Sequence, residues 1–441
     1  MLFKAIFTNS SGILFSRVLG FVRDLLTASI LGANIYSDLF FVAFKLPNLF
    51  RRIFGEGAFT QAFIPAFAKS TKKVRFSSVV LLQILSFILI LSIFVSLFSH
   101  LVIKIIAVGF DPKLLDLGAP LVAITFYYLP LIFLVSFFSA LLQYKNHFAT
   151  TAYSTALLNL ALIGALLLAR HKDSCIIATY LSYGVVVGGF LQVLAHLYSI
   201  KRFGLLKLFS LKDLSVKYTK KFYHTFLQAS IGSSTAHISS FIDTWLASFL
   251  ISGSISHLYY GNRIFQLPLA LFAIATSIAL FPMVAKAIKK NKTEEALRLM
   301  RKSFWILFFV LGFATLIGII FSHQIIFLLF QRGSFTPSDT LHTQTILSMY
   351  LVGLLPFGLS KIFLLWLYSL QEQKKAAKIS IIALTWNIIF SLALIIPYKA
   401  TGLALASSLS GFVLFFLTVK EFGFKSFWKL LKFSYNKSSR G

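Results

Sequence analysis

The chain contains little cysteine, few acidic residues and little charge of any kind. Its 441 residues include a single cysteine, Cys175, so neither a disulfide within the chain nor a metal site built from cysteines can form. Charged residues make up 12% of the sequence, about half of the ~25% that is usual for soluble proteins. A soluble enzyme or a soluble binding domain therefore fits this composition poorly.

Hydrophobic residues are abundant instead, at 58% of the chain, and the mean hydropathy is +0.84. Apolar stretches of about 18 residues or more follow one another with short gaps, which is typical of serial transmembrane helices. We predict an all-α polytopic membrane protein. Its twelve expected spans are residues 8–31, 36–67, 77–108, 117–142, 149–169, 175–200, 223–251, 255–285, 303–331, 342–370, 377–398 and 400–419.

The net charge of +29 would suggest nucleic-acid binding in a soluble protein, but the basic residues are distributed as a topology signal. One set of alternate loops, together with both termini, holds 29 of the 42 lysines and arginines, whereas the other set holds six. The positive-inside rule therefore places both termini in the cytoplasm. We expect no nucleic-acid partner.

An internal repeat divides the chain in two. A glycine and a Leu-Pro pair recur at an offset of 221, and a Leu-Gln pair and an asparagine recur at an offset of 228. The matched residues are Gly32 with Gly253, Leu46-Pro47 with Leu267-Pro268, Leu142-Gln143 with Leu370-Gln371, and Asn159 with Asn387. We predict two pseudo-symmetric six-helix lobes, 1–221 with its basic linker and 222–420, around a central cationic cavity. A basic cytoplasmic tail, 421–441, follows, and Phe427, Trp428 and Leu431 are expected to dip into the membrane surface.

Several charged residues lie inside the expected spans, although a charge at the bilayer centre costs roughly 2.5–3.5 kcal/mol. Lys45 and Arg52 could reach the membrane surface with their long side chains. Arg17 could pair with Asp24, which lies seven residues further along the same helix. The residues that we single out are Arg17, Arg23, Asp24, Asp38, Lys45, Arg51, Arg52, Asp243, Arg263 and Lys361.

Cations outnumber acids in this set. Six cations of the set lie in the first, second and eighth spans, against two acids of the same set, Asp24 and Asp38. The surplus indicates a water-filled, positive cavity that an anion would complete. Arginine suits phosphate, because its planar guanidinium donates two parallel hydrogen bonds and stays protonated. Pro47 and Pro268 would break their helices and allow bending.

A second candidate site lies in the later lobe. Asp243, in the seventh span, and Asn387, in the eleventh, could coordinate Na⁺ or bind a proton. The alternative is that Asp243 only accepts hydrogen bonds from neighbouring Ser and Thr residues, and both interpretations stay open. His171, His257 and His323 are scattered near helix ends and indicate no catalytic cluster.

Two long segments, Phe15–Asp24 and Ser37–Phe59, closely resemble the MurJ (MviN) family of bacterial lipid II flippases. Weaker similarity continues through Tyr259–Arg263 and Ser360-Lys361. The resemblance implies membership of the exporter superfamily that includes multidrug and polysaccharide-lipid transporters. It also implies that the substrate is lipid II, the polyprenyl-pyrophosphate-linked peptidoglycan precursor. The protein would move lipid II from the inner to the outer leaflet of the bacterial cytoplasmic (inner) membrane by alternating access.

The resemblance further implies roles for individual residues. Arginines that match Arg17, Arg23, Arg51 and Arg263 line the central cavity in the family, and the acid that matches Asp38 is also important. Asp243 and Asn387 match the cation site of those members that have one. The residues that we place in supporting positions are Asp24, Asn48, Arg52, Glu56, Gln266 and Lys361.

Two departures from the family pattern matter. Gln266 stands where the family often has an acid, and the expected spans number twelve whereas family members usually have fourteen. The last two helices of the family help to form a groove for the lipid tail.

Other interpretations remain beside the flippase. A transporter of the same fold could carry another lipid-linked oligosaccharide or drugs, although a drug exporter would be expected to show acids in its interior. A membrane enzyme would need clustered carboxylates or histidines at a membrane surface, so we expect no enzyme and no bound cofactor. The energy source is left open between Na⁺ or H⁺ coupling and the membrane potential. Expected partners are lipid II and membrane lipids, with other cell-wall synthesis proteins as a further candidate.

Overall fold

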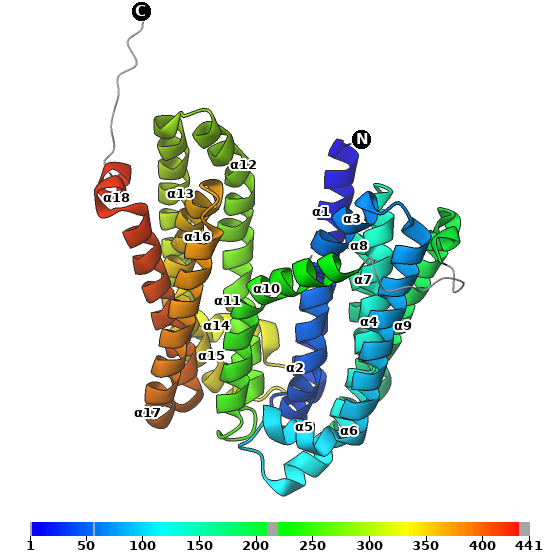
Figure 1. Cartoon of the computed structure of the whole chain (residues 1–441). Coiled ribbons are helices and arrows are strands. Elements are labelled where there is room, and N and C mark those ends of the chain that lie inside the picture. Colours follow the sequence, from blue (N-terminus) through cyan, green and yellow to red (C-terminus); the bar gives the residue numbers. More distant parts are fainter. Residues whose placement is uncertain (1, 56–57, 210–218, 432–441) are drawn as a thin grey trace, which may run out of the picture. The chain divides into compact units, whose positions relative to one another are not determined.

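The apolar runs of the sequence form long helices in the computed structural model, which describes residues 2–55, 58–209 and 219–431 (Figure 1). The chain divides into two compact units. The first contains Met1–Ser256 and Phe330–Thr336, and the second contains His257–Leu329 and Pro337–Gly441.

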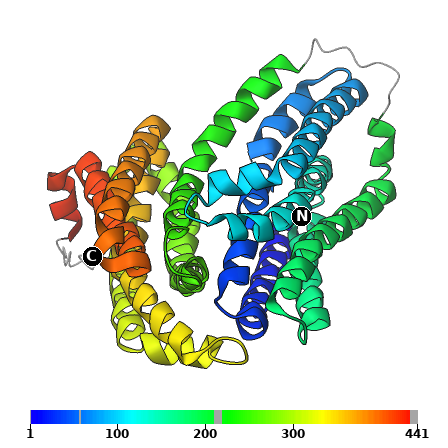
Figure 2. The ribbon, with the colours of Figure 1, turned by 90° about the horizontal axis from the view of Figure 1, so that it is seen from below.

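The first unit packs its opening helix closely against helices that come much later in the sequence. α1 lies beside α8, and α8 lies beside α9 (Figures 1 and 2). A Cβ atom at Gly12 of α1 would come within 2.7 Å of the Ala152 Cβ of α8, so glycine is what allows this approach. The helices of this unit are α1 (Leu2–Leu31), α2 (Ile35–Gly55), α3 (Ala58–Lys69), α4 (Lys73–Leu97), α5 (Ser99–Ile106), α6 (Pro112–Phe126), α7 (Tyr128–Tyr144), α8 (Ala149–Ala169), α9 (Ser174–Arg202), the short 3₁₀ helix Leu205–Leu208, and α10 (Lys220–Ala247).

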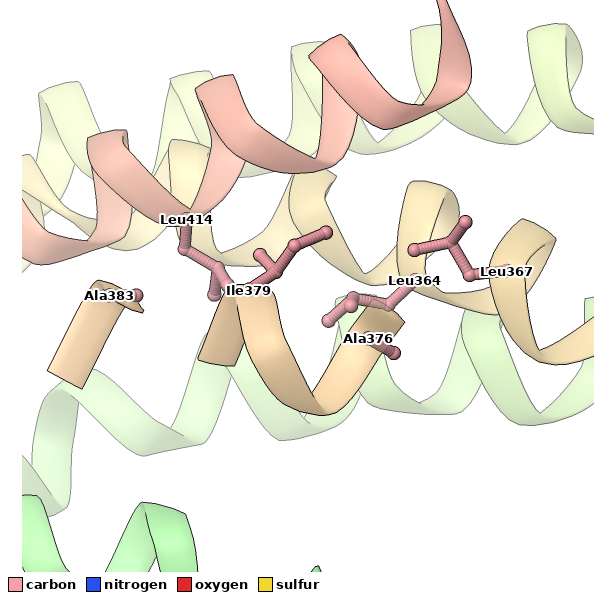
Figure 3. Packing of buried hydrophobic residues seen from close by; sticks show 6 residues of the cluster. All are labelled: Leu364, Leu367, Ala376, Ile379, Ala383 and Leu414. Carbon is pink, nitrogen blue, oxygen red and sulfur yellow. The ribbon is translucent and has the colours of Figure 1, made fainter. Parts of the chain in front are cut away.

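The second unit has its own apolar core, made by α16 and both ends of α17. Leu364 and Leu367 of α16 form a buried cluster with Ala376, Ile379 and Leu414 of α17 (Figure 3). The helices from here to the end of the described chain are α11 (Ser254–Pro268), a π-helical stretch (Leu269–Ile274), α12 (Ala275–Lys289), α13 (Thr293–Ile320), α14 (Ser322–Phe330), α15 (Pro337–Val352), α16 (Leu354–Ser369), α17 (Gln373–Phe422) and α18 (Phe424–Leu431).

The predicted fold class is confirmed, because each expected span falls on one helix or on a run of consecutive helical elements. Eight helical stretches in the described part of the chain are long and apolar enough to cross a membrane. The total of twelve crossings stays a prediction. α17 covers the last two expected spans, and its backbone leaves the helical region at Lys399 (φ 49°, ψ −131°), the residue between 377–398 and 400–419.

The repeat is visible in local backbone conformation. Gly32 and Gly253, matched at an offset of 221, both adopt positive φ, at 79° and 88°. Each lies just before the second long helix of its predicted lobe, where glycine tolerates a left-handed turn. Spatial contacts place α10 in the first compact unit, so the compact units and the predicted lobes divide the chain at different points. The lobe boundary at 221 stays a prediction.

The tail helix α18 packs on protein where the sequence suggested membrane contact. The ring of Phe427 lies 6.0 Å from Phe304 and 5.8 Å from Phe363, whereas Trp428 remains 63% exposed. Arg301 of α13 donates hydrogen bonds to the Lys429 carbonyl at 2.8 Å and to the Leu430 carbonyl at 3.0 Å. Arg301 therefore ties α13 to the last turn of α18 that the structure describes.

The loop before α15 is held against the end of α1 inside the first unit. The Ser334 amide donates to the Ser29 carbonyl at 2.7 Å, and the Ser334 hydroxyl donates to the Ile30 carbonyl at 2.9 Å. These are the carbonyls that the end of a helix leaves unsatisfied. A similar contact joins the loop before α6 to the end of α10, where the Gly109 amide donates to Ser248 Oγ at 3.0 Å.

Gly333→Ala is expected to destabilise the protein. Gly333 has φ +58°, and a Cβ there would run into the Ser29 carbonyl oxygen. The left-handed conformation alone costs a residue other than glycine about 1–3 kcal/mol. A thermal melt in detergent should show a lower melting temperature than wild type. Gly312→Ala is the matched control, because no atom other than the backbone of its own helix and its chain neighbours lies within 4 Å of its Cβ position. An equal loss in both variants would contradict this account.

Candidate substrate-binding site

Two neighbouring residues of α1, Arg23 and Asp24, form an ion pair inside the first unit. Arg23 Nη2 lies 2.5 Å from Asp24 Oδ1, and Arg23 Nε donates to the same oxygen at 3.1 Å. The side chain of Asp24 is 1% exposed and that of Arg23 is 16% exposed. A carboxylate so deeply buried needs a cation beside it, and Arg23 supplies it.

The alternative that Arg17 pairs with Asp24 is not what the structure shows. Asp24 contacts Arg23 instead, and Arg17 is exposed. Residues 17 and 24 do lie near one helical face, but the arginine side chain is long enough to turn back over its own helix from position 23. Arg17 is therefore an exposed cation of α1, whereas Arg23 is paired with Asp24.

Asn159 of α8 completes this arrangement, and sequence reasoning gave it no role at the site. Its Oδ1 accepts from Arg23 Nη1 at 3.1 Å, and its Nδ2 donates to the Ser16 carbonyl at 3.1 Å. The residue is 8% exposed. The only signal in the sequence was its match to Asn387 in the repeat, which marked the position without indicating its partner.

The arginine of α2 is also oriented by an amide. Arg51 Nε donates to Asn48 Oδ1 at 2.9 Å, three residues back along the helix, and Arg51 is half-buried. The structure therefore brings together two residues that the resemblance put in the site. Lys45 donates from Nζ to Ser240 Oγ of α10 at 2.8 Å. The Arg52 side chain and Glu56 lie outside the described residues.

Asp38 is a buried helix cap. Its Oδ2 accepts from the Gly253 amide at 2.7 Å, and its Oδ1 accepts from the Ser256 amide at 2.8 Å and hydroxyl at 2.6 Å. Ser37 Oγ lies 2.7 Å from Ser256 Oγ. The amides at the start of α11 lack helical acceptors, and a carboxylate there also suits the helix dipole. Both carboxylate oxygens accept hydrogen bonds from protein donors, so Asp38 ties α2 to the first turn of α11. Its role in substrate binding stays a prediction.

The other predicted site residues lie in the second unit, apart from Asp243. Arg263 of α11 is half-buried, and Gln266 of the same helix donates to Asn262 Oδ1. Lys361 of α16 is half-buried. Asn387 is 2% exposed and donates to Ser407 Oγ at 3.4 Å. Asp243 belongs to the first unit, so its combination with Asn387 in one cation site stays a prediction.

One histidine is less isolated than the sequence suggested. His257 Nε2 lies 2.9 Å from Asp339 Oδ1, and the His257 ring stacks on His342 with centroids 5.3 Å apart. These contacts link the starts of α11 and α15. Among the described residues, no group of three or more His, Cys, Asp or Glu side chains is placed to hold a metal.

The sequence matches the family model of the lipid II flippase MurJ over residues 27–439. The chain belongs to the lipid II flippase MurJ family. It is 49% identical over 421 residues to the probable lipid II flippase MurJ of Helicobacter pylori (strain ATCC 700392 / 26695), covering 92% of this chain and 91% of that protein. It is 35% identical to the probable lipid II flippase MurJ of Buchnera aphidicola subsp. Baizongia pistaciae, covering 92% of this chain and 80% of that one.

Solved structures agree with the MurJ relationship. A lipid II flippase MurJ in an inward closed conformation superposes with a TM-score of 0.83 at 26% identity, covering 96% of this chain and 89% of that one. An inward-facing multidrug resistance MATE family transporter of the MOP superfamily gives a TM-score of 0.74 at 14% identity, over 98% and 99% of the two chains. The second likeness shows the shared exporter fold alone.

Proposed function

We propose that this MurJ-family chain moves lipid II from the inner to the outer leaflet of the bacterial cytoplasmic membrane by alternating access. The observation that carries the proposal is the family match along almost the whole chain, with 49% identity over 92% of it. The protein is then a multi-pass transporter rather than an enzyme. The distribution of basic residues supports cytoplasmic positions for both termini.

The pyrophosphate of lipid II is the group that we assign to the arginines. In the first unit Arg17 is exposed, Arg51 is oriented by Asn48, and Arg23 is held by Asp24 and Asn159. An arginine whose orientation is fixed by other side chains loses less entropy when it binds a phosphate than a free one does. Arg263 of α11 stays a predicted ligand of the pyrophosphate.

The cap at Asp38 supports a transport cycle with two states. It joins α2 to the first turn of α11, and the predicted topology puts this contact at the outer side of the membrane. Release of lipid II to the outer leaflet would require α2 and α11 to separate there. We therefore assign the three hydrogen bonds at Asp38 to the state that is closed to the outside and expect them to break when that side opens.

The energy source could be a cation gradient or the membrane potential. One elementary charge that crosses a potential of 100 mV yields about 2.3 kcal/mol, which is enough to bias two states that differ by a few kcal/mol. Neither source requires a bound cofactor.

Complementation tests the function. A bacterium depleted of its own lipid II flippase should resume growth and outward lipid II movement when it expresses this chain. Well-inserted protein that restores neither would refute the proposal, and restored export of a different lipid-linked sugar without lipid II would favour another transporter of the same fold.

A further inference from the structure

Asn159 of α8 contacts both ends of the segment of α1 that carries Arg17 and Arg23. Its amide nitrogen reaches the Ser16 carbonyl, next to Arg17, and its amide oxygen reaches the Arg23 guanidinium. The amide orientation follows from chemistry, because the reverse would place two N–H groups against a cation. α8 is therefore registered against α1 at the level of both arginines.

The Arg23 guanidinium lies between two acceptors of different charge. Nε and Nη2 both donate to the single oxygen Asp24 Oδ1, whereas Nη1 donates to the neutral oxygen of Asn159. Asp24 alone would allow the guanidinium to rotate about the carboxylate, and the third contact fixes the plane. Asn159 does this without adding negative charge, so Arg23 keeps part of its attraction for an anion.

We propose that Asn159 is a positioning residue for the pyrophosphate of the substrate: it holds Arg23 in the plane that binds phosphate and prevents complete neutralisation by Asp24. The inference rests on the proposed function, since it needs an anionic substrate at Arg23. A neutral acceptor is required at position 159, because a second carboxylate would compete with the phosphate for the same cation.

Two substitutions of similar size separate positioning from simple helix packing. Asn159→Leu removes both hydrogen bonds, and Asn159→Asp keeps an acceptor for Arg23 but adds a charge. If Asn159 only joined α8 to α1, the aspartate variant would be the milder one. If Asn159 orients Arg23 without neutralising its positive charge, the aspartate variant binds substrate more weakly than the leucine variant.

The measurement is lipid II affinity and flipping rate for the full chain, purified in detergent and then reconstituted in vesicles. We expect Asn159→Leu to weaken lipid II binding about tenfold, the size of one hydrogen bond to a charged group. Asn159→Asp should weaken it further, and the maximal flipping rate at saturating lipid II should change less than the affinity in both. Asn159→Ser, which is shorter and uncharged, should lower lipid II affinity as much as Asn159→Leu. It replaces the leucine variant in the comparison if that variant does not fold.

Gln192→Leu is the matched control. Gln192 is a buried amide of α9 that accepts from the Tyr128 hydroxyl at 3.2 Å and donates to the Ser154 carbonyl at 3.1 Å, and its recorded partners carry no charge. Its removal should leave lipid II affinity unchanged. Wild-type affinity in Asn159→Leu and Asn159→Ser, or a milder effect of Asn159→Asp, would overturn the inference. Failure of the wild-type chain to bind lipid II would instead refute the proposed function.

Discussion

Asp38→Ala should abolish lipid II transport and lower the free energy of unfolding by about 3 kcal/mol or more. The carboxylate accepts three hydrogen bonds at the start of α11 and is 2% exposed. Its removal leaves two buried amides and a hydroxyl without their acceptor, and each such donor costs about 1–3 kcal/mol. The state closed to the outside loses its tie between α2 and α11. Thermal melts and flipping rates in vesicles report the two effects.

Asp111→Ala is the control for removal of a helix cap. Asp111 Oδ1 accepts from the Leu114 amide at 2.9 Å at the exposed start of α6, so its loss should cost about 1 kcal/mol and leave transport intact. The assignment of Asp38 fails if Asp38→Ala flips lipid II at the wild-type rate, or if both variants lose the same stability.

Arg17→Ala should leave the fold intact and remove most lipid II binding. Arg17 is exposed and is not the partner of Asp24, so its loss leaves no buried carboxylate unpaired. A charge-assisted contact with phosphate contributes about 1.5–3 kcal/mol, which corresponds to a loss of affinity of roughly 10- to 100-fold. Binding of lipid II to the purified variant, together with its melting temperature, measures both parts.

Arg170→Ala tests whether any exposed arginine would have the same effect. Arg170 is exposed after α8 and donates to His171 at 2.8 Å, away from the predicted substrate path. It should bind lipid II as wild type does. Unchanged affinity in Arg17→Ala, or equal losses in both variants, would contradict the pyrophosphate assignment.

The helices were predictable because their signal is local. An apolar run long enough to cross a bilayer predicts a span without knowledge of any tertiary contact. The structure is helical at each expected span. The division of α17 at Lys399 was also predictable, because Pro397 lacks the amide that continues a helix and a lysine follows two residues later. Glycine occurs at both matched positions, Gly32 and Gly253, because the backbone makes the same left-handed turn before α2 and before α11.

The pairing of charges was not predictable in the same way. Helical spacing places Arg17 and Asp24 near one face of α1. It does not predict the direction of a long arginine side chain, and in the structure Arg23 is the residue that pairs with Asp24. The cap at Asp38 joins residues more than two hundred positions apart, and no local pattern indicates which helix start will meet a given carboxylate. Asn159 and His257 were missed for the same reason, because their roles depend on partners from other helices.

A disulfide at the cap tests the transport cycle most directly. Ser37 and Ser256 bring their hydroxyl oxygens within 2.7 Å, and the single native cysteine can be replaced by Cys175→Ser. On that background Ser37→Cys and Ser256→Cys together should cross-link α2 to α11 on oxidation. The account predicts that oxidised protein in vesicles stops flipping lipid II, that reduction restores the rate, and that neither single variant responds to oxidant. Undiminished flipping by fully cross-linked protein would show that α2 and α11 need not separate there and would contradict the account.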